Sequence, residues 1–212
     1  MVQSQSRLQK HENQSKTGGF SDELTRFFLS SPAAQKIFIA IVGLLLVSAT
    51  ITVNPLFAAG FFALALWLLR YDIARRNVAS DRLTRFIAIC LLSGYVWLVI
   101  AGLLGMAGAF TPGHIWRDAA LHSIGLGFVF AMVFGHAPII FPAVTRIKIP
   151  YHPVLYLPLV LLHLTLALRV FGGLFDNFAL RQHASLFNGL VLVVFIATMV
   201  LLVRSNTKRG TR

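Results

Sequence analysis

Long apolar runs, separated by short polar or proline-containing breaks, dominate this chain of 212 residues. About 20 apolar residues are needed to cross the hydrocarbon core of a bilayer. The runs therefore predict an all-α fold, a polytopic membrane bundle of about six transmembrane helices. Charged residues make up 12% of the chain, about half the usual share of a soluble domain, which argues against that class. The predicted spans lie near residues 36–53, 56–69, 86–110, 119–144, 154–171 and 183–203.

The segments outside these runs divide the chain into a membrane domain, residues 31–204, and two tails. Residues 1–30 are polar, and we expect a disordered tail that ends in a short interfacial helix over residues 20–30. Residues 205–212 form a basic tail. Asn54-Pro55 predicts a tight turn between the first two spans. Pro138 and Pro142 remove backbone donors and should kink the fourth span.

Basic residues alternate from one side of the predicted bundle to the other. With six spans, 16 of the 19 Lys and Arg residues fall in segments on one side. Cytoplasmic loops of membrane proteins carry this excess, so both termini are predicted to be cytoplasmic, at a bacterial inner membrane. The same clustering explains the net charge of +12 without a nucleic-acid partner, since the cations follow the span ends and not a groove.

The predicted spans contain no Asp or Glu. Intramembrane carboxylates are typical of proton-coupled transporters and of carboxylate-bridged metal sites, so both classes are disfavoured. The single cysteine, Cys90, lies in an apolar run and is expected to be a small core residue.

Histidine carries the remaining ionisable chemistry of the spans, and six of the seven histidines lie in the last hundred residues. His122 and His183 are predicted near the outer ends of spans four and six, at the level of Arg169 and Arg181. Imidazoles that ligate iron and arginines that pair with propionates would suit a b-type heme at this face.

A deeper pair, His136 and His163, is predicted at similar depths on spans four and five. In a regular α-helix, His122 and His136 would differ by roughly 40° around the axis and by ~21 Å along it. One helix face could then serve two metal centres, or one heme edge and one copper ion. Each histidine taken alone could equally hydrogen-bond a neighbouring helix.

Several of these residues resemble the NnrS family of heme- and copper-containing membrane proteins, which are linked to nitric oxide tolerance. The similarity covers residues 119–171 and includes His122, Gly127 and Met132 at intervals of five. Ala143-Val144-Thr145-Arg146 and Leu168-Arg169-Val170 are similar to family motifs that end two spans. The chain departs from the family at Pro153, which follows His152, and in having half the usual number of spans.

The resemblance implies a membrane protein that binds heme b, and allows copper, in nitric oxide response or respiratory electron transfer. Its partners would be the lipid bilayer and a respiratory or other membrane complex. The alternative is a structural or assembly subunit of a membrane complex without a cofactor, and a small transporter is disfavoured. The predicted cofactor contacts are His122, His163, His183, Arg169 and Arg181, and the predicted metal ligands are His122, His136 and His163.

Overall fold

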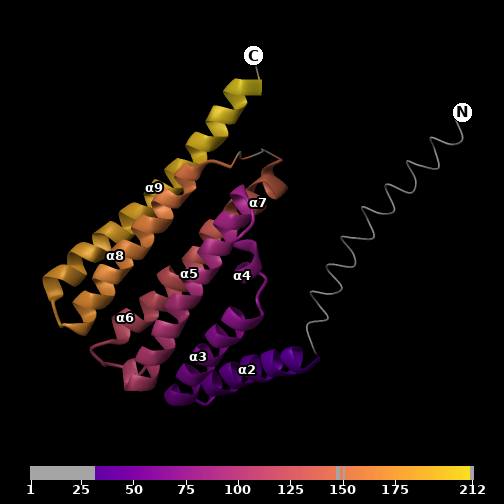
Figure 1. Ribbon diagram of the computed structural model, residues 1–212. Coiled ribbons are helices and arrows are strands. Elements are labelled where there is room, and N and C mark those ends of the chain that lie inside the picture. The colour runs from indigo at the N-terminus through magenta and orange to yellow at the C-terminus, as the bar shows by residue number, and fades with distance from the viewer. Residues whose placement is uncertain (1–31, 147–148, 150, 211–212) are drawn as a thin grey trace, which may run out of the picture. The chain divides into compact units, whose positions relative to one another are not determined.

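The computed structural model describes residues 32–146, 149 and 151–210, and all regular secondary structure within them is helical (Figure 1). The predicted tail over residues 1–30, with its interfacial helix, lies outside the described residues, as do the last two residues of the basic tail. The chain divides into two compact units between Ala40 and Ile41. The packing that follows is that of the second unit, Ile41–Arg212.

Within the described residues, six helices are long and apolar enough to cross a membrane. The predicted all-α fold with six spans is therefore confirmed, and the chain is an integral membrane protein. Which side of the membrane holds the termini stays a prediction. The spans are α2 (Pro32–Thr50); α3 (Asn54–Tyr71); α5 (Arg82–Leu104) with the π-helix η1 (Gly105–Ala109); α6 (Arg117–His122), the π-helix η2 (Ser123–Phe130) and α7 (Ala131–Thr145); the 3-10 turn η3 (Pro153–Leu155) with α8 (Tyr156–Leu174); and α9 (Phe178–Gly210).

Proline marks a helix break at Asn54-Pro55 but not at Pro138 or Pro142. The helix α3 begins at Asn54, with proline in its first turn, and Thr52 just before it adopts a left-handed φ of 55°. The helix α7, in contrast, continues through Pro138 and Pro142. The irregular winding of the fourth span lies upstream of both prolines, in η2.

The helices of the second unit pack through aromatic and branched side chains. The helices α8 and α9 run side by side, and α5 packs against α3, η2 and α7 (Figure 1). Phe134 of α7 stacks on Phe195 of α9 with ring centroids 3.8 Å apart, inside a cluster that also contains Phe86 and Leu162. The other side of α9 exposes apolar residues at helical spacing, as a lipid-facing surface does.

Small residues allow α5 to approach η2 closely. A Cβ atom at Gly94 would lie 3.3 Å from the carbonyl oxygen of Phe128, and one at Gly127 would overlap the side chain of Trp97. Small residues at such crossings are a common feature of membrane helix packing. This crossing brings Trp97 of α5 between the fourth and fifth spans, where Leu166 also packs against it.

We expect the Gly127→Ala variant to be less stable than the wild-type chain. The added methyl group has no room beside Trp97, and overpacking of this kind costs about 1–3 kcal/mol. Gly125→Ala is the matched control, because no atom lies within 4 Å of a Cβ at that position. Thermal unfolding of both variants in the same detergent measures the difference, and equal midpoints for the two would contradict the close crossing.

Candidate functional site

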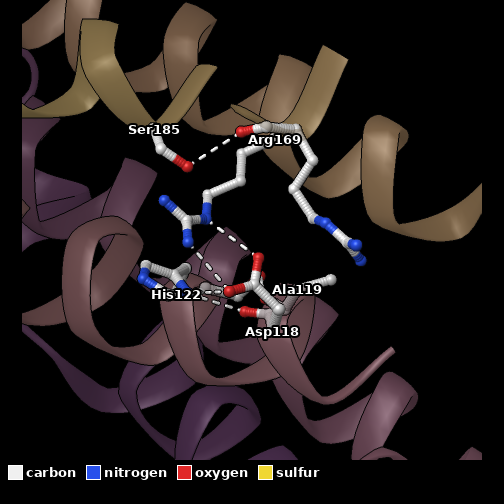
Figure 2. A network of polar contacts seen from close by, with 7 residues as sticks. Asp118, Ala119, His122, Arg169 and Ser185 are labelled. Atoms are coloured by element: carbon white, nitrogen blue, oxygen red, sulfur yellow. Dashed lines mark hydrogen bonds and ion pairs between the residues drawn. The ribbon is translucent and has the colours of Figure 1, made fainter. Parts of the chain in front are cut away.

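A bidentate ion pair joins the fourth and fifth spans at one end of the bundle. Asp118 lies in the first turn of α6, where the positive end of the helix dipole favours a carboxylate. Arg169 of α8 donates from Nε to Oδ2 at 2.9 Å and from Nη2 to Oδ1 at 2.8 Å. Figure 2 shows both contacts as dashed lines, together with those of His122 to Asp118. Both oxygens of Asp118 are therefore fixed in place.

His122 lies one helical turn after Asp118 and contacts it twice. Its Nδ1 is 2.8 Å from the Asp118 carbonyl oxygen and 3.3 Å from the Asp118 Oδ1 (Figure 2). Because both neighbouring atoms are acceptors, the network assigns the proton of a neutral imidazole to Nδ1. Nε2 is then an unprotonated acceptor, and within the described part of the chain it has no hydrogen-bond partner. The His122 side chain is 34% exposed.

That arrangement is the one in which proteins present imidazole to metals. A ligating histidine almost always donates its other N–H to a carboxylate or a backbone carbonyl, which fixes both its tautomer and its ring orientation. His122 has both kinds of acceptor at Nδ1. The same geometry would also suit a proton acceptor, since Nε2 is basic and reachable.

The other residues predicted at this end have different surroundings. Arg169 is engaged by Asp118. The guanidinium of Arg181 lies 5.7 Å from the ring centroid of Phe178 and makes no hydrogen bond among the described residues. His183 is exposed on α9 and likewise has no hydrogen bond in that part of the chain. His122, Asp118 and Arg169 are thus brought together, and no contact joins His183 to them.

His163, the deeper residue of α8, has both ring nitrogens engaged. Trp97 donates from Nε1 to Nδ1 at 2.9 Å, so the imidazole proton resides on Nε2. Nε2 lies 2.9 Å from the hydroxyl of Ser93, which donates onward to the Cys90 carbonyl. Each donor in this series of hydrogen bonds, from Trp97 to the Cys90 carbonyl, has an acceptor. In this arrangement His163 has no free nitrogen for a metal, and it links α8 to α5.

His136 of α7 repeats part of the His122 geometry. Its Nδ1 lies 2.8 Å from the carbonyl oxygen of Met132, and its Nε2 has no partner among the described residues. The expected offset of roughly 40° between His122 and His136 assumed a regular α-helix. The eight residues of η2 lie between them, and the wider i→i+5 winding changes that offset.

The described residues contain no group of three or more His, Cys, Asp or Glu side chains placed to hold a metal ion. His122, His136 and His163 therefore do not together form one metal site. A site that uses His122 must complete its coordination with a cofactor or with another molecule.

The sequence identifies the candidate histidines but does not predict the side chains that contact them. Asp118 lies one residue before the predicted fourth span, and its spacing of four residues from His122 is the signal that could have identified the pair. Trp97, in the predicted third span, is a buried hydrogen-bond donor to His163, and its sequence position gives no signal of that partner. His152 caps the start of η3, because its Nδ1 accepts from the Val154 N–H.

Comparison with known proteins assigns a family without a function. Residues 22–204 match the family described as Domain of unknown function (DUF8744). This match covers most of the chain, which therefore belongs to that family. No curated protein and no solved structure matches the chain.

We expect Trp97→Phe to destabilise the chain, because it leaves the Nδ1 of His163 without a donor inside the bundle. Interhelical hydrogen bonds in membrane proteins contribute roughly 0.5–2 kcal/mol. Trp116→Phe is the control, since the buried Nε1 of Trp116 has no hydrogen-bond partner among the described residues. Unfolding free energies in mild detergent should show a larger loss for Trp97→Phe, and the reverse order would contradict the interhelical bond.

Proposed function

We propose that this chain is a heme-b-binding membrane protein in which His122 ligates the iron through Nε2. The observation that carries the proposal is the position of the His122 Nδ1 beside two acceptor oxygens of Asp118, which assigns the proton to Nδ1. Its Nδ1 is held by Asp118 and its Nε2 is free at a partly exposed position. Bound heme would supply reversible one-electron chemistry or a site for a diatomic gas.

Asp118 and Arg169 support this role as positioning residues. The carboxylate of Asp118 is anchored by two bonds from Arg169, so the acceptors beside the His122 Nδ1 stay in place. A fixed acceptor at Nδ1 raises the basicity of Nε2 as a ligand. The contacts with Asp118 account for two nitrogens of Arg169, and the predicted pairing of Arg169 and Arg181 with propionates stays a prediction.

The geometry favours heme over copper. A heme iron already has four nitrogen ligands from its macrocycle, so one imidazole is sufficient to hold it. A protein copper site needs several side-chain ligands, and such a group is absent from the residues that the structure describes. Copper is therefore not part of the proposal.

The biological role rests on the resemblance of residues 119–171 to the NnrS family, which includes His122. A heme-binding chain of this kind would act in nitric oxide response or in respiratory electron transfer, at a bacterial inner membrane. Its partner would be a respiratory or other membrane complex.

A second candidate function is a structural or assembly subunit without a cofactor. The observation that favours it is the fully satisfied chain from Trp97 through His163 to Ser93, which uses a histidine only to join helices. The two candidates differ at His122. A structural histidine there would leave no heme in the purified protein.

We expect His122→Gly to lose most of its heme relative to wild type, and added imidazole to restore it, because free imidazole can occupy the vacated ligand position. His152→Ala is the control, since His152 is exposed and caps η3. Visible spectra after heme-replete expression and mild-detergent purification measure the heme content. An unchanged heme content in His122→Gly would assign the iron to another ligand and contradict the proposed role of His122.

Asp118→Asn should weaken heme binding by about 10–100-fold, because it removes the charge beside the His122 Nδ1 and keeps the side-chain shape. Asp176→Asn is matched in chemistry, and the carboxylate of Asp176 has no contact with His122 among the described residues. Heme titration of the apoprotein gives both dissociation constants. Identical constants for Asp118→Asn and wild type would remove Asp118 from the site.

A further inference from the structure

A second polar feature, an open depression of about 490 Å³, lies at the same end of the bundle as His122. The loop before α6, α6 itself, the turn between α8 and α9 and the first turn of α9 form its walls. The lining residues are His114, Ile115, Arg117, Asp118, Leu121, Asp176 and Arg181. His122 is not among them, and Asp118 is the residue that the depression shares with the His122 network.

The depression presents hydrogen-bond donors that the protein leaves unused. Arg181 makes no hydrogen bond through its guanidinium among the described residues. Arg117 donates from Nη1 to the carbonyl of Phe110, which fixes its side chain and leaves its other N–H groups available. His114 accepts the Trp116 backbone N–H at Nδ1, so its neutral form carries the proton on Nε2. His114 is thus a third lining residue that carries an N–H donor.

The two carboxylates of the lining do not neutralise the positive charge of Arg117 and Arg181. Both oxygens of Asp118 are bound by Arg169, so the Asp118–Arg169 pair is neutral. Asp176 is then a single negative charge against Arg117 and Arg181. One net positive charge remains, and planar guanidinium groups match the oxygens of a phosphate.

Apolar residues surround the depression and indicate the source of that phosphate. Ile115 and Leu121 line it and are 58% and 44% exposed. Phe175 and Phe178, at the turn between α8 and α9, are 77% and 66% exposed. Apolar side chains this exposed, at the ends of membrane spans and beside arginines, suit the boundary between headgroups and acyl chains.

We propose that the depression binds the phosphate group of a phospholipid, held by Arg117 and Arg181 with the Nε2–H of His114. The acyl chains lie against the exposed apolar residues of the rim. This site does not depend on heme. It would fix one lipid at the end of the bundle that holds His122.

The test compares three probes on the full-length chain after delipidation in mild detergent. Phosphatidylglycerol carries phosphate and acyl chains, diacylglycerol carries the chains alone, and inorganic phosphate lacks them. A ligand that binds only the folded state raises the thermal midpoint as its concentration rises. We expect phosphatidylglycerol to raise it, with a smaller effect at high salt, and the other two probes to leave it nearly unchanged.

The double variant Arg117→Gln/Arg181→Gln should weaken the apparent affinity for phosphatidylglycerol by about tenfold or more, because charge-assisted hydrogen bonds are lost. Arg75→Gln is the control, as an exposed arginine on the short helix α4 (Ala74–Asn77) with the same change of charge. An equal response to diacylglycerol, or an unchanged affinity in the double variant, would overturn the proposal. An equal response to inorganic phosphate would assign a soluble anion.

Loss of heme from the double variant with an unaltered lipid response would assign the arginines to heme propionates, and would also overturn the lipid site. Loss of heme from His122→Gly, with a normal response to phosphatidylglycerol, would support a lipid site that is independent of heme. The two proposals therefore fail separately.

Discussion

The ion pair between Asp118 and Arg169 is the constraint on which the arrangement of this end of the bundle depends. It joins the first turn of α6 to the last turns of α8 through two short bonds, and it is only partly exposed, at 30% and 14% of the two side chains. Bidentate pairs of this kind fix orientation as well as distance. The direction of the His122 ring follows from it, and so does the net positive charge of the neighbouring depression, because Arg169 neutralises Asp118.

The histidines of the bundle are divided by what their Nδ1 atoms do. At His122 and His136, Nδ1 faces a backbone carbonyl and Nε2 is free, whereas at His163 the Nδ1 accepts from Trp97 and Nε2 is used as well. The glycine-lined crossing of α5 and η2 brings Trp97 to His163. Both ring nitrogens of His163 are thus engaged in hydrogen bonds between helices, whereas among the described residues the Nε2 of His122 has no hydrogen-bond partner.

The sequence was sufficient to predict the fold because apolar run length and the positions of breaks such as Asn54-Pro55 follow directly from bilayer thickness and backbone chemistry. The histidine-rich spans were identified for the same reason, since ionisable groups are rare there. The contacts between spans could not be predicted. Which helix faces which depends on packing, so Trp97 and Ser93 gave no signal as partners of His163. The π-helix η2 has no sequence signature, and the prolines after it suggested a kink elsewhere.

The central claim is that the Nε2 of His122 ligates a heme iron while Asp118 holds Nδ1. Resonance Raman spectroscopy of the reduced, purified full-length chain tests it most directly, because an iron–imidazole stretching band reports the metal–ligand bond itself. We expect such a band, and we expect it to shift when the histidines are labelled with ¹⁵N. Protein that contains no heme after heme-replete expression would contradict the account. So would bound heme whose low-frequency bands do not shift with the ¹⁵N label.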